Sequence, residues 1–353
     1  MSESLNHKNY SQYIRFKALV LVVLLALLIF LALADLALGS AGLSLADVGK
    51  AVFGLGDRKI VTIVQKMRLP RVATALVAGF GLAAVGCVMQ SILRNPMADA
   101  STLGVSPGAA FGAAFAIVVL NSGIQSPSDA SVSFATPFTL SLCAFVCSMI
   151  PTVVILSLSR LQRVKPESMI LTGVALATLF SGGTAIIQYF ATTTQLGSIV
   201  FWTFGSLTST TMREVWIMAA VTAAAFVFFF LNRWNYTALL SGESAAKALG
   251  VNTDALVIGS MIVCSLTAAV TTAFIGILNF IGLIAPHIVR RIIGNDYRFL
   301  LPASALAGTC LLLLSDLLSR MILAPQVLPI GAITFFVGAP VFIYLINRRN
   351  RRP

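Results

Sequence analysis

Long apolar runs alternate with short polar segments along almost the whole chain. The runs lie at residues 18–38, 70–92, 101–121, 134–158, 167–191, 213–232, 254–273, 276–293, 302–321 and 331–347. Each is close to the roughly 20 residues that a helix needs to cross the hydrocarbon core of a bilayer. Because the runs are continuously apolar rather than alternating, they predict helices and not the strands of a membrane barrel. The pattern therefore predicts an all-α polytopic membrane protein with about ten transmembrane helices in a single domain at 18–347.

Polar segments flank and interrupt this domain. Residues 1–17 form a polar N-terminal tail, and residues 348–353 form a basic C-terminal tail. The run at 18–38 is as long as a full span, so we interpret it as an uncleaved first helix and not as a signal peptide. A polar loop at 234–252 separates the sixth and seventh runs and contains the sequence LLSGESAAKALG at 239–250. This sequence predicts a short amphipathic helix that ends at Gly250, since glycine tolerates the left-handed conformation that closes many helices.

The composition excludes a soluble domain of this size. Of the 353 residues, 58% are hydrophobic and 10% are charged, with a mean hydropathy of +0.94, whereas soluble domains carry roughly 25% charged residues. The net charge of +12 does not indicate nucleic-acid binding, because 16 of the 24 Lys and Arg residues fall on the side that holds both termini when ten spans are crossed. Positive charge marks the cytoplasmic side of a membrane protein. We therefore expect both termini and the 234–252 loop to be cytoplasmic.

A second group of cations departs from this rule. It occupies the first outer loop and the start of the second span, at Lys50, Arg58, Lys59, Lys66, Arg68 and Arg71. One explanation is contact with lipid headgroups, and the other is an acidic partner on the outer side. The sequence alone leaves both open.

No catalytic or metal site stands out, and we expect no cofactor. The five cysteines lie inside apolar runs; Cys143 and Cys147 are four residues apart but lack a third ligand, which favours packing over metal binding. His287 has no neighbour at metal-ligand spacing. The phosphate-binding pattern GxxxxGK[ST] is also missing from the sequence. If a nucleotide drives this protein, another chain binds it.

Three classes of membrane protein are considered as explanations of these observations. They are a permease driven by a separate ATPase, an ion-gradient-driven secondary transporter that acts alone, and a polytopic enzyme. The absence of a His, Asp and Glu cluster from the sequence disfavours the enzyme. Secondary transporters usually place ionisable groups near the bilayer midplane. Here Asp35 and Asp316 lie near the ends of their runs, which disfavours the secondary transporter.

Four ordered blocks of sequence carry a family resemblance. They are RLPR (68–71) with QSILRNPMAD (90–99) and LG (103–104), then GE (242–243) with ALG (248–250), then FIGLIAPHIVR (280–290), and finally DLLSR (316–320) with LPIG (328–331) and GAP (338–340). Together they resemble the FecCD-type permeases, the membrane subunits of type II ABC importers for iron-siderophores, haem and vitamin B12. The resemblance extends from about residue 20 to residue 347.

This resemblance implies a larger machine in the inner membrane of a bacterial cell. Its parts would be a second permease subunit, identical or paralogous, two cytoplasmic ABC ATPase subunits, and a periplasmic or lipid-anchored substrate-binding protein. The chain itself would be a transport subunit and not an enzyme, and ATP-driven alternating access would move the cargo. A ferric siderophore is the expected cargo because it is the most common in the family, with haem, cobalamin and an oxyanion left open.

The resemblance also identifies 234–252 as the loop that couples the permease to its ATPase. The coupling residues would be Gly242, Glu243, Ala245, Ala246, Leu249 and Gly250. Glu243 would complement the dipole of the short helix from its first turn. Ala245, Ala246 and Leu249 would form a small apolar face for a groove on the ATPase.

On the outer side, Arg68, Arg71 and Arg320 match positions that meet acidic residues of the binding protein. One outer acidic position is missing, because Val327 stands where the family usually has Glu.

Four residues are candidates for the transport pathway. Asn95, Pro96 and Met97 match the family's Asn-Pro-Leu segment, which would form either a cytoplasmic gate or a simple helix-end turn. Pro96 blocks helix continuation in either case. Asn279 belongs to GILN (276–279), where the family often has Gly-Pro-Ile-Gly. It would either face the pathway or cap the eighth helix.

Overall fold

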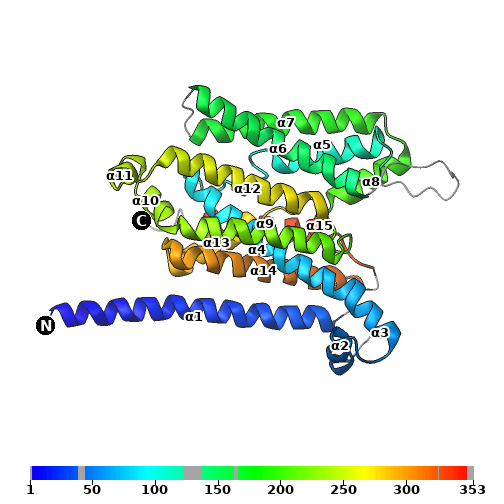
Figure 1. Ribbon diagram of the computed structural model, residues 1–353, viewed down its shortest axis with the longest axis horizontal. Coiled ribbons are helices and arrows are strands. Elements are labelled where there is room, and N and C mark those ends of the chain that lie inside the picture. Colours follow the sequence, from blue (N-terminus) through cyan, green and yellow to red (C-terminus); the bar gives the residue numbers. More distant parts are fainter. Residues whose placement is uncertain (1, 39–43, 123–136, 163–165, 325, 348–353) are drawn as a thin grey trace.

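A computed structural model describes residues 2–38, 44–122, 137–162, 166–324 and 326–347, and within these ranges the chain is helical with no strand. The elements are α1 (Ser2–Ala37), α2 (Leu45–Val52), α3 (Arg58–Ile63), the π-helical turn η1 (Val64–Arg68), α4 (Leu69–Ile92), α5 (Val105–Val118), α6 (Pro137–Gln162), α7 (Pro166–Tyr189), α8 (Thr193–Thr203), α9 (Met212–Leu231), α10 (Arg233–Leu240), α11 (Glu243–Ala248), α12 (Thr253–Ile275), α13 (Ile281–Ile293), α14 (Tyr297–Met321) and α15 (Ile330–Asn347). Most of the long helices run side by side (Figure 1).

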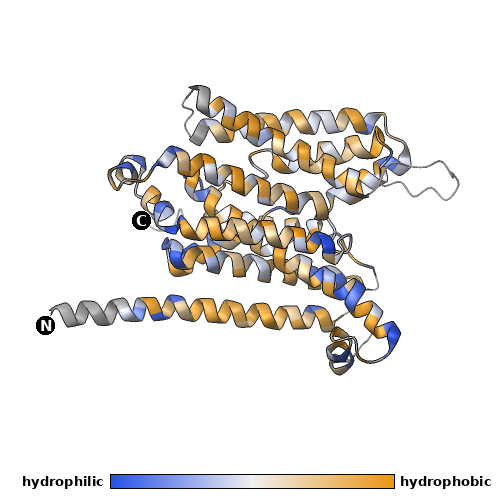
Figure 2. Ribbon diagram, viewed as in Figure 1, coloured by the Kyte–Doolittle hydropathy of each residue, from blue (hydrophilic) through white to orange (hydrophobic). Residues whose placement is uncertain are grey.

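Each predicted span has a helix in the structure. Seven helical segments of the described chain are long and apolar enough to cross a membrane: Ser11–Ala37, Arg58–Ile92, Phe138–Ser159, Ser168–Tyr189, Met212–Leu231, Thr253–Ile275 and Tyr297–Met321. Apolar residues fill the middle of these helices, while polar residues gather near their ends (Figure 2). The shorter helices α5, α13 and α15 account for the third, eighth and tenth runs. The all-α polytopic fold is thus confirmed.

Two predicted spans were too long. The third run, expected at 101–121, is helical only over α5, because Gly104 adopts a positive φ of 88° immediately before it. The eighth, expected from residue 276, begins at Ile281, because Gly276 at φ 78° and Phe280 at φ 69° break the helical backbone. The first helix is instead longer than predicted, since α1 begins at Ser2 and includes the expected N-terminal tail. The basic tail at 348–353 lies outside the described residues.

Helix α4 lies at the centre and packs against α9, α12, α13 and α14. The closest helix contacts are made at glycine residues, because residues with little or no side chain let helix backbones approach each other in lipid. A Cβ atom at Gly86 would overlap the carbonyl oxygen of Gly282 on α13. In the same way, Gly108 and Gly112 of α5 lie against backbone carbonyls of Cys147 and Cys143 on α6. Gly108 and Gly112 therefore let α5 and α6 pack closely.

The helices define two ends of the molecule. The start of α1, together with α10 and α11, lies at one end, and α2, α3 and α8 lie at the other (Figure 1). We call these the α11 end and the α3 end. Helix α4 connects them, beginning beside Arg68 at the α3 end and ending near Arg94 at the α11 end.

Candidate functional site

The short helix expected within 239–250 is present at the α11 end as α11, and its coupling role stays a prediction. Gly242, at φ 109°, precedes α11, and Gly250, at φ 83°, follows it. The amide of Gly250 donates to the carbonyl of Lys247 at 3.0 Å, and the amide of Val251 donates to Ala246 at 3.0 Å, which closes the helix. Helix α10 supports this unit by burying Tyr236 and Leu239. The result is a folded unit and not a loose loop.

Glu243 connects α11 to the end of α4. Its carboxylate accepts a hydrogen bond from Lys247 at 2.8 Å and lies 3.4 Å from Nη2 of Arg94. The hydrogen bond from Lys247, followed by the charges of Lys247 and Arg94, lowers the pKa of Glu243. Arg94 itself has a positive φ of 48° in the turn after α4. No local sequence pattern indicates this contact, because the two residues lie 149 positions apart.

One of the expected apolar coupling contacts is wrong. Ala246 is wholly buried against the protein's own core and cannot form part of an outward face. The reason is helical geometry, since the face of α11 that carries Ala246 packs inward. Leu249 is 73% exposed, and Ala245 is half-buried. The exposed side of α11 therefore presents Leu249 beside the charges of Glu243 and Lys247.

The segment 95–97 lies in the turn after α4, at the same end of the molecule. The amide of Met97 donates to Oδ1 of Asn95 at 2.8 Å, and the amide of Ala98 donates to the carbonyl of Asn95 at 3.0 Å. Asn95 thus builds the turn with its own side chain, and Met97 is exposed. The geometry fits the helix-end turn, and a gating role for Asn95, Pro96 and Met97 stays a prediction.

Asn279 lies apart from that segment, just before α13. The helix begins after Phe280 and has no side-chain cap, so the alternative that Asn279 caps it is wrong. Its Oδ1 atom is buried and has no hydrogen-bond partner among the described residues. A pathway role for Asn279 stays a prediction.

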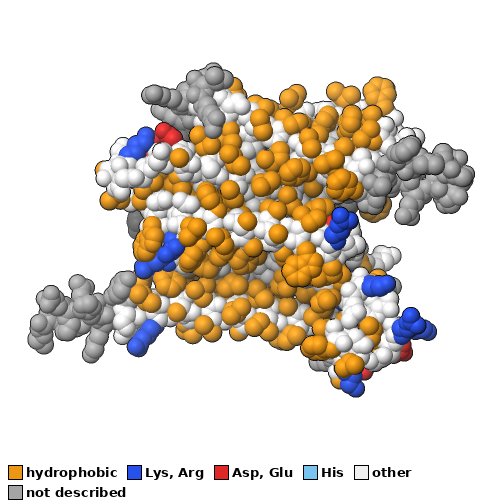
Figure 3. Space-filling view, in the orientation of Figure 1, with side chains coloured by type: hydrophobic (Ala, Val, Ile, Leu, Met, Phe, Trp, Pro, Cys, Tyr) orange, Lys and Arg blue, Asp and Glu red, His pale blue; other side chains and the backbone are white. Residues whose placement is uncertain are grey.

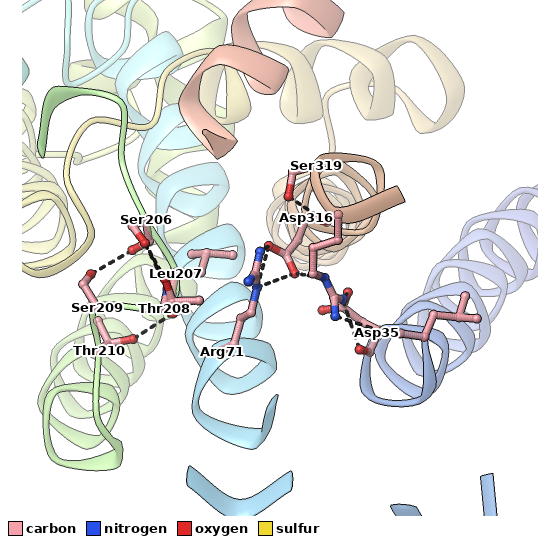
Figure 4. Close-up of polar contacts among 11 residues, drawn as sticks. Asp35, Arg71, Ser206, Leu207, Thr208, Ser209, Thr210, Asp316 and Ser319 are labelled. Atoms are coloured by element: carbon pink, nitrogen blue, oxygen red, sulfur yellow. Dashed lines mark hydrogen bonds and ion pairs between the residues drawn. The ribbon is translucent and has the colours of Figure 1, made fainter. Parts of the chain in front are cut away.

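At the α3 end, the three expected docking arginines are engaged inside the chain. Arg71 donates to Asp316 from Nε and Nη2 at 2.7–3.0 Å. Arg320 forms an ion pair with Asp35, and its Nε lies 3.3 Å from Asp316. Figure 4 shows Arg71 and Asp35 on opposite sides of Asp316. The side chains of Arg71 and Arg320 are each 11% exposed.

Arg68 completes this cluster by a different contact. Its guanidinium donates to the carbonyl oxygens of Leu36 and Ala37 at 2.7 and 3.0 Å. These are two of the otherwise unpaired carbonyls at the end of α1. The arginines therefore hold α1, α4 and α14 together. Docking to a second protein stays a prediction for Arg68, Arg71 and Arg320.

Comparison with known proteins decides the family. A model of the FecCD transport family matches residues 24–348. The chain belongs to the FecCD transport family. A Methanocaldococcus jannaschii protein named as an ABC transporter permease is 44% identical over 345 residues, covering 98% of this chain and 99% of the relative. The Fe(3+)-citrate import system permease of Bacillus subtilis is 32% identical over 336 residues, covering 95% and 96%.

A solved structure extends this similarity to three dimensions. It is an inward-facing conformation of a metal-chelate type ABC transporter, with a TM-score of 0.80 and 28% identity, covering 93% of this chain and 99% of that one. This FecCD protein is therefore a multi-span membrane protein with the fold of a type II ABC importer permease. The family consists of transport permeases and not of enzymes, and such permeases act with ATPase and substrate-binding partners.

Proposed function

We propose that this chain is the membrane-spanning permease subunit of an ATP-driven importer that moves a ferric siderophore or a similar metal chelate into the cytoplasm. One observation carries the proposal. The α10–α11 unit is folded and buried on one side, exposes Leu249 on the other, and contacts the end of α4 through Arg94 and Glu243. An ATPase that displaces α11 would therefore act on the central helix of the bundle.

The proposed assembly contains two such permeases, two ATPases and an extracytoplasmic binding protein. The α11 end faces the cytoplasm, consistent with the many Lys and Arg residues on that side. ATP binding draws the ATPases together, and their motion passes through the 234–252 loop into α4. Alternating access follows when α4 and the helices packed on it change their arrangement as a unit.

The cargo class is supported by two relatives. One is named for import of Fe(3+)-citrate, and the matching structure belongs to a metal-chelate transporter. Within this chain, no group of three or more His, Cys, Asp or Glu residues in the described ranges could hold a metal ion. A chelate carried as a whole does not require the pathway to ligate its metal.

The test is purification and reconstitution of the complex. The chain is expressed with its neighbouring ATPase and binding protein, purified, and placed in liposomes with ⁵⁵Fe-citrate outside and ATP inside. We expect a stable ATPase complex and vanadate-sensitive iron uptake, with a catalytically inactive ATPase variant as control. Absence of an ATPase complex, or uptake that vanadate does not reduce, would contradict the proposal.

One observation favours the secondary transporter as a second candidate. Asp99 lies in the loop between α4 and α5 and is almost fully buried, and burial raises its pKa to about 6. A carboxyl group that titrates near this pH is suited to proton coupling. Iron uptake by the isolated chain, driven by a pH gradient without ATP and abolished by Asp99→Asn, would support that candidate.

A further inference from the structure

Cationic and aromatic side chains alternate across three helices at the α11 end, where the start of α14 packs against both α1 and α10 (Figure 1). On the α1 side, Nζ of Lys17 lies 3.9 Å from the ring centroid of Tyr13 and 5.4 Å from that of Phe299 on α14. The guanidinium of Arg298 lies 5.7 Å from the same Phe299 ring. Cations attract aromatic faces at these distances, so the contacts join α1 to α14.

The same row continues from α14 to α10. The guanidinium of Arg298 lies 5.0 Å from the ring centroid of Trp234, and that of Arg233 lies 5.7 Å from it. Arg233 also lies 4.4 Å from the ring of Phe230, at the end of α9. Two guanidinium groups from different helices therefore flank one indole ring.

This row of cations is poorly neutralised by the described chain. Arg298 donates to both oxygens of Asp296 at 2.8–3.2 Å, and Lys17 lies 3.5 Å from the same carboxylate. Among the described residues, no carboxylate pairs with Arg233. Its Nη1 donates to the carbonyl of Phe230 at 2.8 Å, one of the carbonyls left without a helical partner at the end of α9. Three cations thus share one acidic group.

The row lies beside apolar surface. Trp234 is 54% exposed, and exposed indole rings are typical of the boundary between membrane and water. The last residue of α9, Leu231, is 70% exposed, and Leu19 on α1 is 58% exposed. In Figure 3, apolar side chains cover the sides of the bundle, while Lys and Arg side chains lie near its two ends. The position is therefore one where the acyl chains of a lipid meet its headgroup.

We propose that Arg233, Trp234 and Arg298 form a binding site for the headgroup phosphate of an anionic phospholipid. A guanidinium fits a phosphate through two parallel hydrogen bonds, and basic sites between membrane helices are typical of anionic lipid recognition. The adjoining apolar surface of α1 and α9 favours a phospholipid over a free phosphate. A lipid bound there holds α10 and α14 together, and α10 leads directly into α11. The inference does not depend on the cargo or on the energy source of transport.

The experiment measures lipid binding to the purified, delipidated full-length chain in a non-ionic detergent. Native mass spectrometry counts bound lipids and gives the dissociation constant, and thermal unfolding reports stabilisation. The probes are phosphatidylglycerol, zwitterionic phosphatidylcholine and inorganic phosphate. The variants are Arg233→Gln and Trp234→Leu. Arg15→Gln is the matched control, because Arg15 is an exposed cation two residues from Lys17 and therefore on another face of α1.

We expect the unmodified chain to retain one tightly bound phosphatidylglycerol, which raises its unfolding midpoint. Loss of a charge-assisted contact should weaken this binding about tenfold in Arg233→Gln, and Trp234→Leu should weaken it in the same direction. Arg15→Gln should bind like the unmodified chain. Phosphatidylcholine should bind more weakly, and inorganic phosphate should not displace the lipid.

Three results would overturn the inference. Equal weakening in Arg15→Gln and Arg233→Gln would show a general attraction of anionic lipid to a cationic end. Displacement of the lipid by inorganic phosphate would show a small-anion site, and unchanged binding in Trp234→Leu would remove the indole from it. Because the side chain of Trp234 is largely exposed, that variant keeps the question open to test even if Arg233→Gln does not fold.

Discussion

Arg94 and Glu243 join the end of the central helix α4 to the first turn of α11, with Nη2 of Arg94 3.4 Å from Oε2 of Glu243. Both side chains are about 40% exposed, at 39% and 41%, so water weakens the pair and its contribution to stability is below about 1 kcal/mol. The pair matters for the position of α11 more than for stability, because it links the helix that carries the exposed Leu249 to the end of α4.

Disrupting this contact should uncouple transport without unfolding the protein. Glu243→Ala removes the partner of Arg94 and Lys247, and Leu249→Asp places a charge on the exposed surface. We expect either variant to lower transport-coupled ATP hydrolysis several-fold, while the midpoint of thermal unfolding shifts little. Ser244→Ala is the control, since Ser244 is an exposed neighbour on α11. Coupled hydrolysis that stays at the level of the unmodified complex in both variants would contradict the role given to α11.

The ionic cluster at the α3 end should behave differently, because it is buried. Asp316→Ala leaves the guanidinium of Arg71 without its bidentate partner and removes one carboxylate from Arg320. Breaking a buried pair in this way costs about 3 kcal/mol or more. We expect a clear drop in the thermal unfolding midpoint in detergent. The double variant Arg71→Met/Asp316→Leu should recover much of the loss, and a double variant as unstable as the single one would argue against the pairing.

The Gly86–Gly282 contact gives a steric prediction. Gly86→Val introduces a Cβ where the backbone of α13 already lies, and neither helix backbone can move aside without loss of packing. We expect loss of the folded protein, measured as aggregation in size-exclusion chromatography. Gly182→Ala is the matched control on α7, because a Cβ there meets nothing within 4 Å. That variant should be neutral, or more stable by about 0.5–1 kcal/mol through its higher helix propensity.

Asp99 should make stability depend on pH. Burial raises its pKa from the ordinary 3.8 to about 6, against the opposing hydrogen bonds from the amides of Ala100 and Ser101. The folded state therefore holds its proton more tightly than the unfolded state. The associated stability is fully present below pH 3.8 and is lost as the pH rises through 6, a difference on the order of 2–3 kcal/mol.

Asp99→Asn should remove this dependence. Relative to the unmodified protein, the variant should gain stability at pH 7.5 and gain little at pH 4. Thermal unfolding in detergent across pH 4 to 8 measures both curves. Parallel curves for the two proteins would show that Asp99 does not titrate in this range.

The polar loop at 234–252 shows which features local sequence can predict. Its Gly-Glu start and Leu-Gly end predicted a short helix, and α11 forms between Gly242 and Leu249. The sequence did not reveal which side would face inward, because α11 is only 6 residues long and its orientation depends on α10. Ala246 was therefore assigned to the wrong face.

The charged residues likewise separate what local sequence predicts from what only the fold decides. The number and position of Lys and Arg residues predicted an outer cationic cluster, and the structure places those residues at one end. Only the fold decided which cations are free. Asp35, Arg71, Asp316 and Arg320 come from three helices and pair at distances in sequence of up to 285 residues, so no local pattern could have joined them. The signal that was available, Asp316 and Arg320 four residues apart on one helix face, accounts for a single pair.

By itself, the sequence determined that this chain lies in a membrane, that its spans are helices, and that it carries the marks of the FecCD family. These properties follow from apolar run length and from ordered motifs, which need no knowledge of distant contacts. The tertiary structure decided where two of those helices begin, which arginines hold the fold together, and which cations, such as Arg233, have no carboxylate partner within the described chain. Such properties depend on side chains that meet only after packing, when burial makes each polar group either find a partner or stay at the surface.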